Sequence, residues 1–176
     1  MEKQKILYKK KLEEIENIKH RNIICIDFDD CLIPWNDLKT RKPNPLELVL
    51  EQTKFNVELL LNFINETEFE PFITSSWAMA LNDDLELDDG WETIHYELFN
   101  ILKQIQFVGK EPFGDRVLAV EVLLENGNRI IGLDDMDYSH YFQNETDAGN
   151  FFMINLYNGY HFKNKLEDAK KFFELK

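Results

Sequence analysis

Apolar residues in this chain gather in short runs, which alternate with segments where they recur at every third or fourth position. Short runs rich in β-branched and aromatic residues favour strands that are covered on both faces. The predicted strands are 23–26, 69–73, 130–133 and 151–156. Segments with helical spacing lie between them, and strands that alternate with helices predict an α/β fold with a parallel sheet.

The predicted helices have apolar residues at helical spacing, and the segment 56–65 shows the full pattern of i, i+3, i+4 and i+7 that is typical of a helix with one buried face. They cover the segments 56–65, 91–103, 115–125 and 166–173. A shorter helix is predicted at 77–85. Two weaker strand predictions are 46–50, where Leu alternates with other residues, and 104–108.

The N-terminal segment 1–20 is strongly charged and carries an apolar stripe at helical spacing. We expect a helix there that packs on the outside of the sheet, and a helix that binds a partner protein is the alternative. The length of 176 residues suits one domain, which is predicted at 21–176.

The composition is that of a soluble globular protein, with 44% apolar and 30% charged residues. A formal net charge of −13 disfavours broad binding to nucleic acid or anionic membranes, although it leaves room for a local basic patch. The chain shows neither a signal peptide nor a run of membrane-spanning length, and no obligate protein partner is indicated. Cys25 and Cys31 fit no zinc pattern, so we expect reduced thiols and a cytoplasmic location.

Carboxylates follow two of the predicted strands. Asp27 and Asp29 come after the first strand, and Asp134 and Asp135 follow the third. The carboxyl ends of parallel strands form the edge at which α/β proteins bind ligands. Residues two apart in a regular strand point to the same side, so Asp27 and Asp29 would repel each other unless a hard cation such as Mg²⁺ lay near them. The alternative is that these acids only cap the strand and enter a turn.

Other polar groups stand where a phosphate group would need them. Thr74 and Ser75 end the second predicted strand just before a helix. Hydroxyls in that position hold a phosphate oxygen together with the helix N-terminus, or simply cap the helix. The proline-rich excursion 33–45 is interpreted as a small flap beside the first strand. Its basic residues form either a solvated loop or a contact for substrate phosphate: Lys39, Arg41 and Lys42.

This arrangement resembles the haloacid dehalogenase superfamily of phosphohydrolases. The first motif of that family is an apolar strand followed by Asp-x-Asp-x-Thr or Val, and it stands here as Asp27-Phe28-Asp29-Asp30-Cys31. Asp30 replaces the usual small residue and adds charge near the site. Cys31 replaces the Thr or Val and is close to them in size. Neither departure removes a group that performs chemistry.

The other three motifs follow in the family's order. Thr74 matches the Thr or Ser that ends a strand. The Lys or Arg before a helix is matched by Lys110, with Arg116 as the alternative. Asp134-Asp135 matches the apolar strand that ends in two acids. The resemblance covers the chain from about residue 23 to its C-terminus.

The resemblance implies a Rossmann-like three-layer α/β/α sandwich with a mostly parallel central sheet, a small flap and no full cap domain. It also implies a Mg²⁺-dependent phosphatase that forms an aspartyl-phosphate on Asp27, with Asp29 as general acid and base. The implied Mg²⁺ ligands are Asp27, Asp29 (through its backbone carbonyl), Asp134 and Asp135. The implied phosphate-binding residues are Thr74, Ser75, Lys110 and Arg116.

The substrate is expected to be large, because the insertions between the motifs do not form a cap that would enclose a small one. We favour the end of a polynucleotide or a nucleotide. The segments 74–82, 132–135 and 158–160 are also similar to compact members of the superfamily found in RNA-repair proteins. The alternatives are a small-metabolite phosphatase or phosphotransferase on the same scaffold, and a non-catalytic binding protein that kept the fold.

Overall fold

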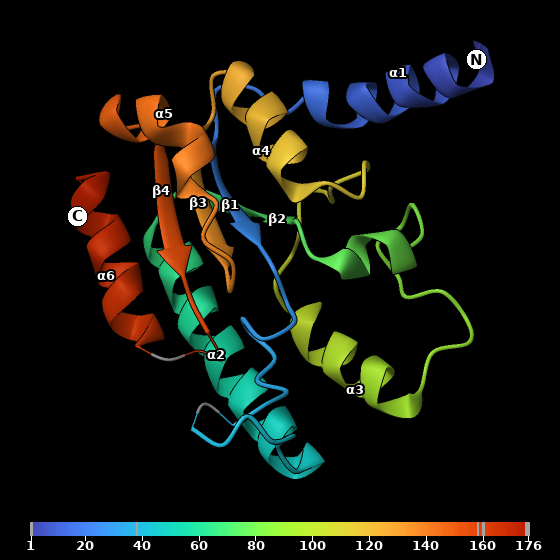
Figure 1. The fold of residues 1–176 in the computed structure, drawn as a ribbon, viewed down its shortest axis with the longest axis vertical. Coiled ribbons are helices and arrows are strands. Elements are labelled where there is room, and N and C mark those ends of the chain that lie inside the picture. The colour runs from blue at the N-terminus through green and yellow to red at the C-terminus, as the bar shows by residue number, and fades with distance from the viewer. Residues whose placement is uncertain (1, 38, 158, 160, 175–176) are drawn as a thin grey trace.

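The computed structural model describes residues 2–37, 39–157, 159 and 161–174 (Figure 1). The strands are β1 (Asn22–Ile26), β2 (Phe69–Ile73), β3 (Arg129–Asp134) and β4 (Phe151–Asn155). The α-helices are α1 (Glu2–Glu16), α2 (Leu46–Glu66), α3 (Thr93–Leu102), α4 (Arg116–Glu125), α5 (Gln143–Asp147) and α6 (Phe162–Phe172). The short 3₁₀ helices η1 and η2 cover Ser76–Ala80 and Ser139–Phe142.

The sheet has the spatial order β2-β1-β3-β4, and every neighbouring pair of strands is parallel. This confirms the predicted α/β fold with a parallel central sheet. Ile26 at the end of β1 is in register with Ile73 of β2 and with Leu133 of β3. The residues that follow these three strands therefore meet at one edge of the sheet, where α/β proteins bind ligands.

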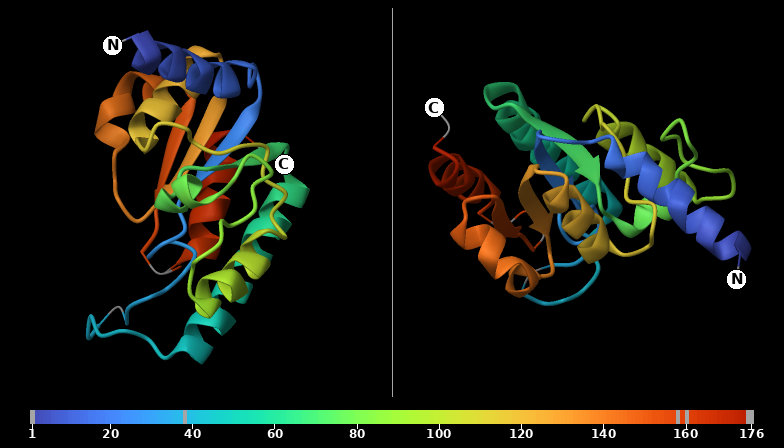
Figure 2. Two further views of the ribbon diagram at one scale, coloured as in Figure 1. Left: turned by 90° about the vertical axis from the view of Figure 1, so that its right-hand side faces the viewer. Right: turned by 90° about the horizontal axis from the view of Figure 1, so that it is seen from above.

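Helices cover both faces of the sheet, so the chain folds into a Rossmann-like three-layer sandwich (Figure 2). Alternate residues of a strand point to opposite faces. Ile24 and Ile26 of β1 belong to an apolar cluster with residues of α2, α3 and α6. Ile23 and Cys25 belong to a second cluster with residues of α1, α4 and η2. All four side chains are fully buried, as the uninterrupted apolar run predicts.

Helix α1 joins the sandwich through its C-terminal end. Ile15 and the following Ile18 are buried in the same apolar cluster as Val120 of α4. The N-terminal end of α1 extends away from the sheet in the views of Figures 1 and 2. The helix expected outside the sheet thus packs on the layer that contains α4.

The segment 46–50 corrects one prediction, because it forms the first turns of α2 and not a strand. Leu46 and Leu48, whose alternation suggested a strand, are 55% and 36% exposed. The buried residues at the start of the helix are Val49 and Thr53, which are four positions apart. The helical period of the buried side therefore determines the structure, and the alternation of leucines is incidental.

Two shorter segments also differ from their predictions. The segment 104–108 contains turns and bends in place of a strand. Its last residue, Val108, donates a backbone hydrogen bond to Pro71 of β2, and an isolated bridge between Ile73 and Lys110 follows. The helix predicted at 77–85 is limited to η1. Leu85 has a φ of 60°, which lies in the left-handed region and is incompatible with a right-handed helix.

The flap at 33–45 is present as an excursion between β1 and α2, and an antiparallel bridge joins its two sides. Its three basic residues are exposed, and the Arg41 guanidinium lies 4.7 Å from the centre of the Tyr157 ring. Asn158 and Tyr160, which contributed to the likeness with RNA-repair proteins, lie outside the described residues. Within the described chain, every helix is too short or too polar to span a bilayer.

Candidate active site

Three neighbouring strands each lead into a polar residue at the same edge of the sheet. Asp27 follows β1, Thr74 follows β2 and Asp134 is the last residue of β3. The Asp27 amide donates to the carbonyl of Leu133 over 2.8 Å, and the Thr74 amide donates to the carbonyl of Ile26 over 2.9 Å. The backbone pairing of the sheet therefore continues to these residues and fixes where their side chains begin.

Three carboxylates converge at this edge and are called the acid cluster: Asp27, Asp134 and Asp135. One oxygen from each lies within 4.8 Å of the oxygens from the other two. Asp27 and Asp134 are buried, whereas Asp135 is half-buried. The Asn155 side chain at the end of β4 donates to the backbone carbonyl of Asp135 over 2.9 Å and holds the turn after β3 in place. The structure thus brings together the two acidic strand ends that the sequence singles out.

Arg116 lies between two carboxylates of the acid cluster. Its Nη1 donates to Asp134 over 2.6 Å and to Asp27 over 3.2 Å. Arg116 is the first residue of α4, and Asp115 caps this helix by accepting two backbone hydrogen bonds. The buried Glu111 carboxylate accepts hydrogen bonds from amides of the preceding loop. Helix capping and this loop together set the position of the guanidinium.

Burial changes the acidity of the cluster. The pKa of Asp27 is raised to about 7, first by burial and then by the neighbouring Asp134 carboxylate, while Arg116 acts in the opposite direction. Burial also raises the pKa of Asp134, although Arg116 again opposes the shift. Three ionised carboxylates facing one guanidinium leave two negative charges, which is the charge that a divalent cation balances.

These shifts predict that the cation-free protein loses stability as the pH rises from 5 to 8. Above the ordinary pKa of about 4, Asp27 is ionised in the unfolded chain, while the folded protein retains this proton up to a pH of about 7. The folded state therefore binds more protons in this range, and the free energy of unfolding falls until the folded pKa is passed. We expect a lower melting temperature in EDTA at pH 8 than at pH 5, measured by circular dichroism.

Asp27→Asn is the matched variant for this measurement, because it removes the titrating group and nearly preserves its size. Its melting temperature should depend less on pH than that of the wild type, and it should be the higher of the two at pH 8. Parallel pH curves for the two proteins would contradict the raised pKa of Asp27.

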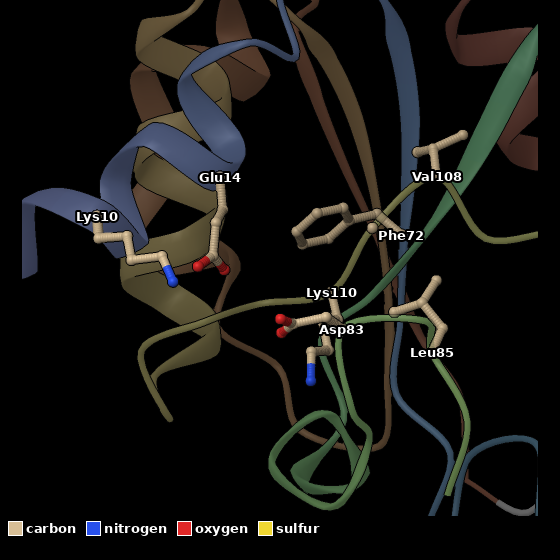
Figure 3. Close-up of a pocket in the computed structure, with 8 residues that line it drawn as sticks. Lys10, Glu14, Phe72, Asp83, Leu85, Val108 and Lys110 are labelled. Carbon is tan, nitrogen blue, oxygen red and sulfur yellow. The ribbon is translucent and has the colours of Figure 1, made fainter. Parts of the chain in front are cut away.

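The two basic residues considered for the third motif lie in different places. The Lys110 ammonium donates to the backbone carbonyl of Leu81, and Lys110 lines the same cavity as Asp83 (Figure 3). This cavity of about 380 Å³ is separate from the acid cluster and also contains Lys10, Glu14 and Phe72. Among the described residues, the basic group that contacts the acid cluster is Arg116.

Asp29 lies outside the acid cluster. Its carboxylate accepts hydrogen bonds from the indole Nε1 of Trp35 over 2.7 Å and of Trp77 over 3.0 Å. A regular strand would point Asp27 and Asp29 to the same side, but β1 ends at Ile26 and a turn follows. The two side chains therefore enter different surroundings, and the third carboxylate of the cluster is Asp135.

The hydroxyls after β2 differ in their partners. Ser75 is buried, hydrogen-bonds to the Asp27 carboxylate and lowers the pKa of that group. Its oxygen also accepts from the Trp77 amide over 3.4 Å, as expected of a helix cap. The Thr74 hydroxyl is buried and has no hydrogen-bond partner within the described part of the chain. Thr74 is therefore the hydroxyl that remains available to a ligand.

The two departures from the first motif are accommodated in the turn after β1. Asp30 takes a φ of 51°, and its carboxylate accepts a long hydrogen bond of 3.4 Å from Asn36. Cys31 is fully buried, and burial raises the pKa of its thiol well above the usual value. Both Cys25 and Cys31 are free thiols.

Sequence reasoning missed the aromatic residues around Asp29. The sequence does contain a signal for them, because Trp35 and Trp77 follow the first two motifs within a few residues. The periodicity of apolar residues, however, predicts only which face of an element is buried. It does not predict which side chains from separate loops contact one another.

Comparisons with protein-family models, with curated proteins and with solved structures found no match. The function is therefore inferred from the residues of the chain itself. The acid cluster offers hard oxygen ligands, a buried nucleophile candidate and an adjacent guanidinium. This combination is suited to chemistry on a phosphate group.

Proposed function

We propose that this protein is a Mg²⁺-dependent phosphatase of the haloacid dehalogenase type, which hydrolyses a phosphomonoester. The acid cluster is the observation that supports this proposal most strongly. It joins the carboxylates of two motifs that are far apart in the sequence, and it places a guanidinium beside them. A cytoplasmic location is part of the proposal, because free buried cysteines suit a reducing compartment.

The acid cluster fits a hard divalent cation. Mg²⁺ and Ca²⁺ both prefer oxygen ligands, and Mg²⁺ is commonly held by one or two carboxylates together with a substrate phosphate. Asp27, Asp134 and Asp135 would hold the cation, and the preference for Mg²⁺ follows from the resemblance to the phosphohydrolase family. When bound, Mg²⁺ supplies the positive charge that lets an anionic nucleophile approach an anionic phosphate.

Asp27 is the proposed nucleophile. One of its carboxylate oxygens attacks phosphorus, the bond between phosphorus and the leaving oxygen breaks, and an aspartyl-phosphate forms. Asp29 donates its proton to the leaving oxygen. It then accepts a proton from the water that attacks the aspartyl-phosphate, and this attack releases inorganic phosphate and restores the Asp27 carboxylate. The indole groups of Trp35 and Trp77 orient Asp29 for both transfers.

The remaining polar groups are proposed to bind the phosphate. Arg116 neutralises charge on its oxygens, since the guanidinium already lies beside the nucleophile. The Thr74 hydroxyl, which has no partner among the described residues, donates to a phosphate oxygen. Ser75 positions the Asp27 carboxylate through its hydrogen bond. Lys110 would have to leave the carbonyl of Leu81 to take the role that the family resemblance implies for it.

Hydrolysis of p-nitrophenyl phosphate tests this function. We expect turnover in the presence of Mg²⁺ and a loss of at least about a hundredfold in EDTA, because removal of the cation leaves an anionic nucleophile facing an anionic phosphate. Asp134→Asn should raise the Mg²⁺ concentration required for half-maximal activity. Glu70→Gln is the control, since Glu70 forms a partly exposed ion pair with Arg21. Hydrolysis that does not depend on a divalent cation would contradict the proposal.

A further inference from the structure

An aromatic pocket lies beside Asp29. Its walls contain all three tryptophans of the chain and one histidine: Trp35, Trp77, Trp91 and His95. The cavity has a volume of about 400 Å³, and Asp29 and Ser76 complete its lining. Its wall residues come from the flap, from η1, and from α3 with the loop before it. Three excursions from the sheet therefore build one pocket.

The rings of the aromatic pocket are grouped around His95. The centre of the His95 ring lies 5.0 Å from that of Trp91, 5.5 Å from that of Trp77 and 6.2 Å from that of Trp35. The planes of Trp77 and Trp91 are 25° apart. Trp91 is 39% exposed, so part of its ring is accessible to a ligand from solvent. His95 Nδ1 is buried and has no hydrogen-bond partner among the described residues.

Asp29 connects this pocket to the proposed reaction. Two wall residues, Trp35 and Trp77, donate hydrogen bonds to its carboxylate. In the proposed reaction Asp29 protonates the leaving oxygen, so the leaving group has to come within hydrogen-bond distance of a residue that lines the pocket. The pocket is therefore placed to contact the part of the substrate that departs from the phosphate.

We propose that the aromatic pocket binds the base of a nucleotide whose phosphate reacts at Asp27. This inference rests on the proposed function and specifies its substrate class. Bases stack on aromatic side chains with little dependence on their identity, because every base has a π face. A base also offers a hydrogen-bonding edge to His95 Nδ1, which the phenyl ring of a phosphotyrosine lacks.

The charge of the protein limits how much of a nucleic acid is recognised. With a net charge of −13, a long polyanion is repelled, so recognition is centred on the single nucleotide that carries the reacting phosphate. A free nucleotide and the last nucleotide of a polynucleotide present the same base and phosphate. The same pocket therefore serves both sources.

Binding of adenosine tests the pocket without catalysis. In ¹⁵N-labelled protein, adenosine should shift the tryptophan indole N–H resonances, whereas ribose should not. In Trp91→Ala the dissociation constant for adenosine should rise about tenfold or more, since one stacking surface is removed. Phe55→Ala is the matched control, because Phe55 is a 59% exposed aromatic residue outside the pocket. This variant should bind adenosine with the same affinity as the wild type. Indole resonances that do not respond to adenosine would overturn the proposal.

Kinetics provide the second test. We expect kcat/KM for adenosine 3′-monophosphate to exceed that for phenyl phosphate and ribose 5-phosphate by at least about tenfold, mainly through KM. Trp91→Ala should remove this preference. An oligonucleotide with a terminal 3′-phosphate distinguishes the sources: a higher kcat/KM than the mononucleotide identifies a polynucleotide end, and a lower one identifies a free nucleotide.

The two proposals fail in different ways. Mg²⁺-dependent hydrolysis with equal kcat/KM for phenyl phosphate and the nucleotide would overturn base recognition and leave the phosphatase assignment standing. Adenosine binding at the tryptophans without release of phosphate from any ester would support the pocket and overturn the proposed reaction.

Discussion

Replacing Asp27 with Asn is expected to lower kcat for p-nitrophenyl phosphate by at least about a thousandfold. The amide is not a nucleophile toward phosphorus and is a weaker metal ligand than a carboxylate. Asp27 is also buried, and within the acid cluster it lies next to both Arg116 and Ser75. Release of p-nitrophenol at saturating Mg²⁺ measures the loss.

The folded state of this variant is the necessary control. Asn nearly preserves the size of the side chain, and Arg116 keeps its 2.6 Å contact with Asp134, so circular dichroism should show a native spectrum and an undiminished melting temperature at pH 8. Asp29→Asn should slow turnover severely while leaving the acid cluster intact. Near-normal activity of Asp27→Asn in a folded protein would mean that another group is the nucleophile.

Arg116→Met is expected to lower kcat/KM by about a hundredfold, which is the usual effect of removing one preorganised donor that stabilises developing negative charge. Lys110→Met should have a much smaller effect, because the Lys110 ammonium is bound to a backbone carbonyl in a separate cavity. The two variants remove the same charge from the same chain. The ratio of their kcat/KM values therefore identifies the cation that acts on the phosphate.

Loss of Arg116 also leaves two buried carboxylates without their guanidinium, so its effect on stability has to be separated from its effect on turnover. Arg116→Lys keeps the charge and should recover part of the activity, and melting temperatures show which variants are folded at the assay temperature. A larger loss of activity in Lys110→Met than in a folded Arg116→Met would make Lys110 the acting cation.

The sheet was predictable from sequence because its strands are short apolar runs without polar alternation. Ile23–Ile26 and Ile130–Leu133 are buried on both faces, and such strands leave little ambiguity in the pattern. The convergence of the acids after them followed from topology alone, since adjacent parallel strands end at the same edge. A strand was predicted for the first turns of α2, because two exposed leucines alternate with other residues there as apolar residues do in a strand.

The finer arrangement of the candidate site depended on turns that periodicity does not describe. Asp29 turns away from Asp27 because β1 ends at Ile26. Lys110 and Arg116 are only six positions apart, yet Lys110 lies in the bridge beside β2 and Arg116 begins α4. The loop that Glu111 organises decides which of these two residues faces the acid cluster. That loop has no repeating sequence pattern from which its path could be predicted.

The acid cluster and the aromatic pocket stand on different parts of the fold, and this difference affects how the chain can diverge. The acid cluster is built on β1 and β3 in the middle of the sheet, where few substitutions are tolerated. The aromatic walls are carried by surface excursions, and Trp91 contributes its ring without holding Asp29. The proposed selectivity for a base can therefore be retuned by exchanging that loop, in evolution or by engineering, while the proposed active site on the strand ends is inherited unchanged.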